Sequence, residues 1–148
     1  MRTVDDRSLI DVGKSVLKGE FMAAWPNGIS AITLFAEDLA TTKRFYEDVF
    51  GLPVHYEDEA SVVFNFGNTL INLLKSTEAV ELIAPAPIAP PGGGARFQFT
   101  IPVDDVDATC AELEKRGVEL LNGPIDRPWG IRTACFRDPA GHIWEIAK

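Results

Sequence analysis

One order of apolar and polar positions occurs twice along the chain, at residues 29–51 and again at residues 96–117. In each copy a run of alternating apolar residues predicts a strand, because successive side chains of a strand point to opposite faces. An aspartate follows, and apolar side chains then recur at helical spacing up to a glycine. We therefore expect helices at 39–50 and 106–116.

The residues at both ends of each predicted helix suit those places. Asp38 and Asp105 can accept hydrogen bonds from the unpaired N–H groups of the first helical turn. Gly51 and Gly117 can adopt the left-handed conformation that commonly ends a helix. Each predicted helix thus begins after an aspartate and ends at a glycine.

Short apolar runs separated by turn residues follow each helix and predict three further strands per half. We expect them at 54–56, 61–66 and 70–74, and at 120–121, 131–136 and 143–147. The element order is then β-α-β-β-β, twice, which is an α+β fold. Since neither unit can bury its apolar face alone, the two should pair, with a cavity between them.

The repeat also predicts how the chain is divided. The first module is expected at 29–77 and the second at 95–148, joined by a linker at 78–94. The Pro-, Ala- and Gly-rich part of that linker, 85–94, should be extended and exposed. Residues 1–28 lie outside the repeat, and their apolar spacing predicts a helical N-terminal extension.

Charge narrows the range of partners. The formal net charge is -8, and residues 1–28 hold as many basic as acidic side chains, so the acidic excess lies in the repeat. Nucleic-acid binders need clustered Lys and Arg, so we expect no nucleic-acid partner. The excess permits a cationic ligand, although surface acid is also common for solubility alone.

Three further features bear on location. No apolar run approaches the ~20 residues that span a bilayer, and the N-terminus lacks a signal-peptide layout. Cys110 and Cys135 form no disulfide framework, and we expect both to be buried as small apolar side chains. We expect a cytoplasmic protein that does not associate with membranes.

Two motifs carry a family resemblance that covers about residues 29–148. The motifs are Asp-Leu-Ala-Thr-Thr-Lys-Arg-Phe-Tyr-Glu-Asp-Val-Phe-Gly at 38–51 and Asp-Pro-Ala-Gly-His-Ile-Trp-Glu at 138–145. At this separation they resemble the vicinal oxygen chelate superfamily, which includes glyoxalase I, extradiol dioxygenases and bleomycin resistance proteins. The resemblance implies that the paired modules form a concave eight-stranded mixed sheet with the helices outside.

In metal-dependent members of that superfamily, each module supplies two metal ligands. The equivalent positions here are Ala31, Asn72, Gln98 and Glu145. Alanine cannot ligate, and amide oxygens serve hard cations only beside carboxylates. A catalytic transition metal needs about three strong donors, and Glu145 alone qualifies. We therefore expect no metal and no other cofactor.

Strand alternation predicts which side chains line a cavity without a metal. They are Thr33, Phe35, Asn72, Arg96, Gln98, Thr100 and Glu145. Glu145 is either a remnant of the metal site that is held by a hydrogen bond, and that Arg96 or Arg132 could neutralise, or a group that recognises a ligand cation. Trp129 is either a stacking surface beside the cavity or a core residue that anchors its turn.

The resemblance implies a metal-free protein that sequesters a small organic molecule, as bleomycin resistance proteins do, and acts as a homodimer. An enzyme is the alternative: a lyase, isomerase or dioxygenase that uses Glu145 with an atypical metal or as a general base. A third possibility is an interaction module whose cavity is filled by its own side chains. The residues do not identify the ligand.

Overall fold

Eight strands and three helices follow one another in the part of the chain that the computed structural model describes, residues 28–148. The first half consists of β1 (Ala31–Ala36), α2 (Leu39–Phe50), β2 (Val54–Glu57), β3 (Ser61–Asn65), β4 (Leu70–Lys75) and α3 (Ser76–Ile83). The second half consists of β5 (Gln98–Pro102), α4 (Val106–Lys115), β6 (Leu120–Asp126), β7 (Arg132–Arg137) and β8 (Ile143–Ala147). The helix expected in the N-terminal extension lies outside the described residues.

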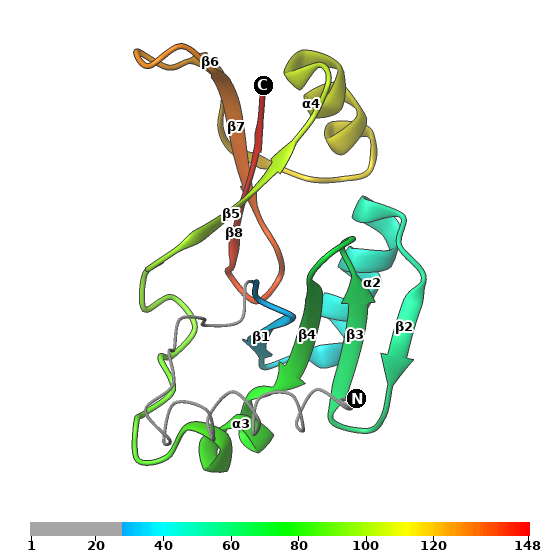
Figure 1. The fold of residues 1–148 in the computed structure, drawn as a ribbon, viewed down its shortest axis with the longest axis vertical. Helices are drawn as coiled ribbons and strands as arrows, with labels where there is room; N and C mark the ends of the chain where they lie inside the picture. The colour runs from blue at the N-terminus through cyan, green and yellow to red at the C-terminus, as the bar shows by residue number, and fades with distance from the viewer. Residues whose placement is uncertain (1–27) are drawn as a thin grey trace, which may run out of the picture. The chain divides into compact units, whose positions relative to one another are not determined.

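The strands form two four-stranded sheets of the same topology (Figure 1). Their orders are β1-β4-β3-β2 and β5-β8-β7-β6. The pairs β1/β4 and β5/β8 are parallel, and the other pairs are antiparallel. The predicted repeat of β-α-β-β-β and the mixed character of the sheets are thus confirmed. The eight strands are shared between two sheets, and no ladder joins β1 to β5 among the described strands.

The predicted helix boundaries are reproduced almost residue for residue. The Asp38 carboxylate accepts a hydrogen bond from the Thr41 N–H at 3.0 Å, and Asp105 accepts one from the Ala108 N–H at 3.0 Å. Gly51 ends α2 with a φ of 67°, in the left-handed region. Helix α4 ends one residue earlier than expected, at Lys115.

Helix α3 is an element that the sequence did not predict. It occupies residues 76–83, where the linker was expected to begin at residue 78. This segment contains Glu, Ala and Leu, which favour helix, and Ala79 is fully buried. Residues 84–97, which follow α3, contain no helix or strand and are mostly exposed, as expected for 85–94.

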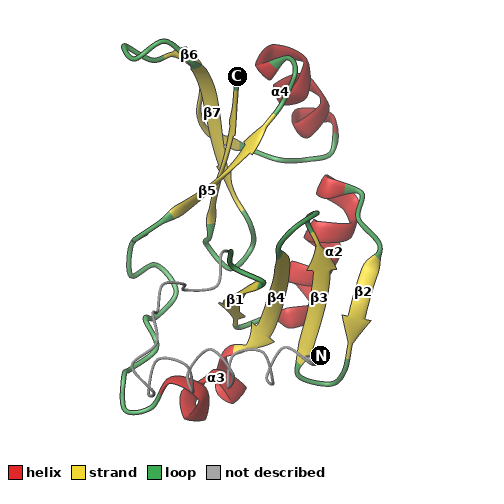
Figure 2. Ribbon diagram, viewed as in Figure 1, coloured by secondary structure: helices red, strands yellow, loops and turns green. Residues whose placement is uncertain are grey.

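The strand register agrees with the predicted alternation. Leu34, Leu73 and Trp144 are buried in the core, where α2 and α4 cover one face of the sheets (Figure 2). Phe99 packs against this core and its ring lies 5.0 Å from that of Trp144. The polar positions between them, Thr33, Asn72, Gln98, Thr100 and Glu145, therefore belong to the opposite faces.

A buried hydrogen-bond network links helix α2 of the first module to the second module. The hydroxyl of Tyr46 donates to Asp138 Oδ2 at 2.8 Å, and Trp144 Nε1 donates to the same hydroxyl at 3.2 Å. Tyr46 and Trp144 are at most 2% exposed, and Asp138 is 3% exposed. Burial, reinforced by the nearby Asp138 carboxylate, raises the pKa of Tyr46, so its hydroxyl stays protonated and can donate.

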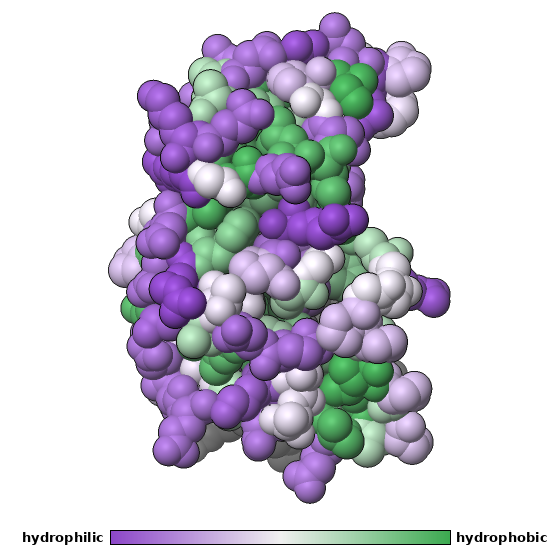
Figure 3. All heavy atoms as spheres, turned by 180° about the vertical axis from the view of Figure 1, so that it is seen from behind, coloured by the Kyte–Doolittle hydropathy of each residue, from purple (hydrophilic) through white to green (hydrophobic). Residues whose placement is uncertain are grey.

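Cys110 and Cys135 are both buried free thiols, as predicted. Figure 3 shows one face on which hydrophilic residues surround smaller apolar areas. None of the helices between residues 28 and 148 combines the length and apolarity needed to cross a membrane.

The Tyr46 network generates the first prediction. Tyr46→Phe leaves the buried Trp144 N–H without its acceptor and Asp138 with one donor fewer. An unpaired buried polar group costs about 1–3 kcal/mol. We expect urea unfolding followed by circular dichroism to show a loss of free energy of that order.

Tyr56→Phe is the matched control. The Tyr56 hydroxyl also donates to a carboxylate, Asp58, at 3.1 Å, but Tyr56 is 56% exposed. Its loss should change the free energy of unfolding by about 0.5 kcal/mol or less. Equal small effects of the two substitutions would show that the Tyr46 hydroxyl does not hold the modules together.

Candidate functional site

The candidate site is a cavity of about 730 Å³ that three chain segments enclose. Strand β1 contributes one wall through Thr33 and Phe35, and residues 87–97 contribute the second. The turn between β7 and β8, with the start of β8 at Ile143, contributes the third. This volume lies in the range of 300–1,000 Å³ typical of small-molecule pockets.

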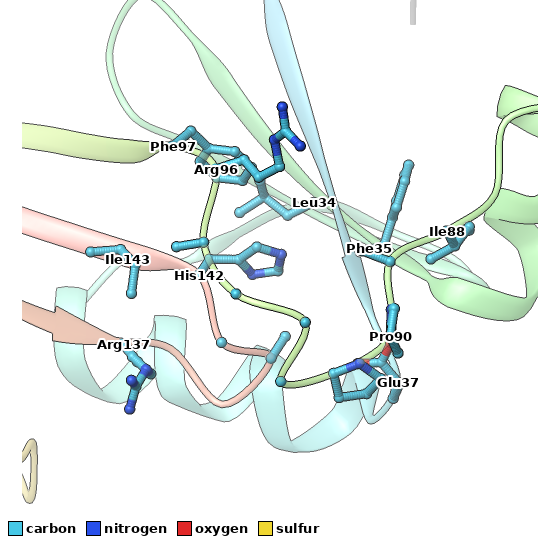
Figure 4. Close-up of a pocket in the computed structure, with 18 of the residues that line it drawn as sticks. Leu34, Phe35, Glu37, Ile88, Pro90, Arg96, Phe97, Arg137, His142 and Ile143 are labelled. Atoms are coloured by element: carbon cyan, nitrogen blue, oxygen red, sulfur yellow. The ribbon is translucent and has the colours of Figure 1, made fainter.

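The walls are apolar, with a few charged or polar side chains between them (Figure 4). Apolar surface comes from Leu34, Phe35, Ile88, Pro90, Phe97 and Ile143. The polar side chains come from all three segments: Glu37 after β1, Arg96 before β5, and Arg137 and His142 at the β7–β8 turn. An apolar body with few polar groups is the chemistry that this lining suits.

His142 is held in place by the buried carboxylate of Asp138. Its Nδ1 lies 2.9 Å from Asp138 Oδ2 and 3.1 Å from Oδ1, and its backbone N–H donates to Oδ1 at 2.8 Å. Because a carboxylate only accepts, Nδ1 carries the proton in this contact. The imidazole therefore has Nε2 as the one ring nitrogen left for a ligand.

The sequence did not predict that His142 lines the cavity. The signal was present in the motif at 138–145, where Asp138 and His142 are four residues apart around a Pro-Ala-Gly turn. Glu37 and the proline- and glycine-rich residues 87–94 were also missed. Their place depends on how the linker returns past β1, which no local pattern specifies.

The structure divides the predicted ligand-binding residues between the cavity and the sheet faces that are not covered by α2 and α4 (the outer faces). Thr33, Phe35 and Arg96 line the cavity. Asn72, Gln98, Thr100, Trp129 and Glu145 are not part of its lining.

On the outer face of the first sheet, Asn72 neighbours Thr33. Its Nδ2 lies 3.4 Å from Thr33 Oγ1, a long hydrogen bond. Asn72 Oδ1 is buried and has no hydrogen-bond partner within residues 28–148. A buried acceptor of this kind is uncommon and marks the place as one where a donor would be stabilised.

On the outer face of the second sheet, Glu145 accepts a hydrogen bond from the Thr100 hydroxyl at 2.8 Å. The thiol of Cys135 lies close by, 3.8 Å from Gln98 Oε1. Burial, reinforced by the Glu145 charge, raises the pKa of Cys135, which keeps the thiol protonated and unreactive. The predicted side chains thus form a small polar cluster in this sheet.

Neither arginine that was expected to neutralise Glu145 does so. Arg132 instead binds Asp107 through Nε and Nη2 at 3.1 and 2.9 Å, and Asp126 through Nη1 at 2.9 Å. Arg96 forms no ion pair within residues 28–148. Arg132 does not pair with Glu145 because its guanidinium binds two other carboxylates, one on α4 and one on β6.

Trp129 lies in the turn between β6 and β7 and is 70% exposed. It is therefore no core residue, and the interpretation of Trp129 as an anchor of its turn is wrong. The turn is closed by backbone hydrogen bonds instead, from Gly130 N–H to Arg127 O and from Arg127 N–H to Ile131 O. Whether its indole stacks on a ligand stays a prediction.

The family positions for a metal do not provide a suitable donor set. Ala31 has no donor, Asn72 faces a threonine hydroxyl, and the carboxylate of Glu145 accepts a hydrogen bond from Thr100. Within residues 28–148 no three His, Cys, Asp or Glu side chains lie close enough together to hold an ion. The residues present therefore do not fit a catalytic transition metal, which needs about three strong donors.

Known proteins resemble this chain over most of its length. The "Uncharacterized protein YraH" of Bacillus subtilis (strain 168) is 35% identical over 121 residues, which cover 79% of this chain and 94% of that protein. A lactoylglutathione lyase from Agrobacterium tumefaciens has a similar structure, with a TM-score of 0.67 and 28% identity over 84% of this chain and 95% of the other. TnmS3, an antibiotic binding protein from Streptomyces sp. CB03234, superposes with a TM-score of 0.65 and 25% identity over 84% and 97% of the two chains.

The sequence comparison with protein families agrees with the topology. Residues 28–146 match the glyoxalase/bleomycin resistance protein/dioxygenase superfamily, and this range contains both β-α-β-β-β units. The chain belongs to the glyoxalase/bleomycin resistance protein/dioxygenase superfamily.

Proposed function

We propose that this protein binds and sequesters a small organic molecule without a metal, in the manner of bleomycin resistance proteins. The observation that carries the proposal is the cavity of about 730 Å³, whose walls are apolar and whose few polar groups come from three separate segments. The likeness to TnmS3, described as an antibiotic binding protein, supports binding as a function of this fold.

The ligand in this proposal lies against Phe35 and Thr33 on β1 and against Arg96 before β5. Contacts with Asn72, Gln98, Thr100, Glu145 and Trp129 stay predictions from the sequence, since these residues do not line the cavity.

We also propose that the protein is a homodimer, as the family resemblance implies. Leu121, Ile125 and Trp129 support this, because all three are exposed on β6 and the turn that follows it. Exposed large apolar side chains on neighbouring segments are a feature of many interfaces. We expect light scattering to give a mass near twice 16.2 kDa; a monomeric mass at tens of micromolar would contradict the dimer.

A second candidate function is catalysis by Glu145 in a lyase, isomerase or dioxygenase. The likeness to a lactoylglutathione lyase favours it, as does the position of Glu145 on the open face of β8 beside Thr100. The donor set weighs against any version that needs a metal.

Metal content therefore provides a test. We expect the purified protein to hold no stoichiometric zinc, nickel, iron or manganese, since Glu145 is the one strong donor among the four family positions. Elemental analysis after purification without chelators measures this. A near-equimolar metal that disappears in Glu145→Ala would favour the enzyme over the binding protein.

Thermal-shift screening tests the binding function itself. A panel of aromatic antibiotics and metabolites should contain ligands that raise the melting temperature. A ligand at ~100 times its Kd stabilises the fold by about 2.7 kcal/mol. For a domain of this size that is a rise of several degrees.

Substitutions then locate the site. Phe35→Ala should reduce the shift because Phe35 supplies apolar cavity surface. Tyr56→Ala, which changes an exposed aromatic residue outside the cavity, should preserve the shift. If no compound shifts the melting temperature, or if Phe35→Ala responds as the parent does, the interaction-module alternative is preferred.

A further inference from the structure

We propose that the cavity selects organic acids, and that Arg96 holds the ligand's carboxylate while the apolar walls cover its body. This inference rests on the proposed function, because it presupposes that the cavity takes up a small molecule. It adds the chemical class of that molecule, which the overall acidity of the protein would not suggest.

The charge of the cavity lining is opposite to that of the protein around it. Residues 29–148 carry the whole acidic excess of the chain, whose formal net charge is -8. Yet the lining contains two arginines, Arg96 and Arg137, and one acidic residue, Glu37. Each of these arginines offers an anion a positive group within an otherwise acidic protein.

Arg96 and Arg137 are both available to a ligand, because neither forms an ion pair within residues 28–148, whereas Arg116 and Arg132 are engaged. Arg132 binds two aspartates, and Arg116 binds Glu112 at 3.0 Å. Arg96 has no ion pair within the described residues. A guanidinium presents a planar set of donors that matches a carboxylate in a bidentate arrangement.

Figure 4 distinguishes the two arginines of the lining. Arg96 lies beside Phe97 and Leu34, and its guanidinium, like that of Arg137, is directed away from the His142 ring. We assign the carboxylate to Arg96 because it adjoins Phe97, whose half-exposed ring can contact the ligand's apolar body.

Backbone donors add to the anion preference. Residues 92–94 are three consecutive glycines in the cavity wall, and Gly92 and Gly94 have φ values of 79° and 94°. The Gly93 N–H donates to Pro90 O at 3.0 Å, while the neighbouring amides make no backbone hydrogen bond in this part of the described chain. Backbone amides in such loops form concavities that favour anions.

His142 and Phe97 provide a fixed flat wall for an aromatic body. Their rings are nearly parallel, with an interplanar angle of 16° and centroids 6.1 Å apart. The Asp138 carboxylate holds the imidazole by Nδ1, so the ring does not need to be ordered when a ligand binds. Phe97 is half-exposed, which leaves aromatic surface for a ligand.

The acidic excess of the protein does not cancel this site. Charges separated by more than the Debye length, about 8 Å at physiological ionic strength, are largely screened. The attraction between a guanidinium and a carboxylate in direct contact is not screened in this way. Glu37 is the acid in the lining, and it should weaken carboxylate binding without preventing it.

Three compounds with one carbon skeleton test the charge preference: 2-naphthoate, 2-naphthamide and 2-(aminomethyl)naphthalene. Isothermal titration calorimetry on the full chain should show the carboxylate binding about tenfold more tightly than the amide, since a hydrogen bond to a charged group exceeds a neutral one. The amine should bind most weakly. An aromatic body is chosen because Phe35 and Phe97 line the cavity.

Two arginine variants test whether direct contact or long-range charge causes the preference for the carboxylate. Arg96→Gln should remove the tenfold preference for the carboxylate. It should change the affinity for the amide by no more than about threefold, because a screened long-range charge has only a small effect. Arg44→Gln makes the same change of net charge at an exposed residue outside the lining, and it should keep the preference. Glu37→Gln should strengthen binding of the carboxylate.

Each remaining outcome bears on one proposal. Equal affinity for the three compounds, a preference for the amine, or no binding of the carboxylate overturns the selection of organic acids. Loss of the preference in Arg44→Gln to the same degree as in Arg96→Gln overturns the role of Arg96. If neutral or cationic hits from the thermal-shift panel still depend on Phe35, the proposed function survives while this inference fails.

Discussion

The buried carboxylate of Asp138 is the interaction on which both the fold and the cavity depend. It receives four donors: the Tyr46 hydroxyl, the imidazole Nδ1 of His142, and the backbone N–H groups of Ala140 and His142. One of these comes from helix α2 of the first module, and the others come from the β7–β8 turn. An unpaired charge would be costly at 3% exposure, so the donors must remain together.

The same contact explains why a turn of the second module can serve as a wall of the cavity. Loops are usually mobile, and part of the binding free energy is then used to order them when a ligand binds. Here Asp138 fixes both the backbone of the turn and the ring of His142. The aromatic core beneath, where Tyr46, Phe50 and Trp144 meet at centroid distances of 4.9–5.9 Å, gives α2 and β8 little freedom to separate.

The family's usual metal positions and the cavity therefore lie on different parts of this chain. Thr33 and Asn72 meet on the first sheet, and Gln98, Thr100 and Glu145 meet on the second. The cavity uses Thr33 and Phe35 of the first sheet, but its other walls are the linker and a turn. In the proposed function, the ligand would therefore contact side chains other than those at the metal positions of the family.

Local patterns in the sequence determined the repeated β-α-β-β-β order, the caps at Asp38 and Asp105, and the face of each strand, because each depends on near neighbours. The absence of a metal-binding donor set could also be predicted, since residue identity alone decides which atoms can ligate. Tertiary structure decided the rest. The course of the linker, the burial of Asp138, the pairing of Arg132 with Asp107 and Asp126, and the exposure of Trp129 all depend on contacts between distant segments. Such contacts are set by packing of the whole domain, which no short-range periodicity encodes.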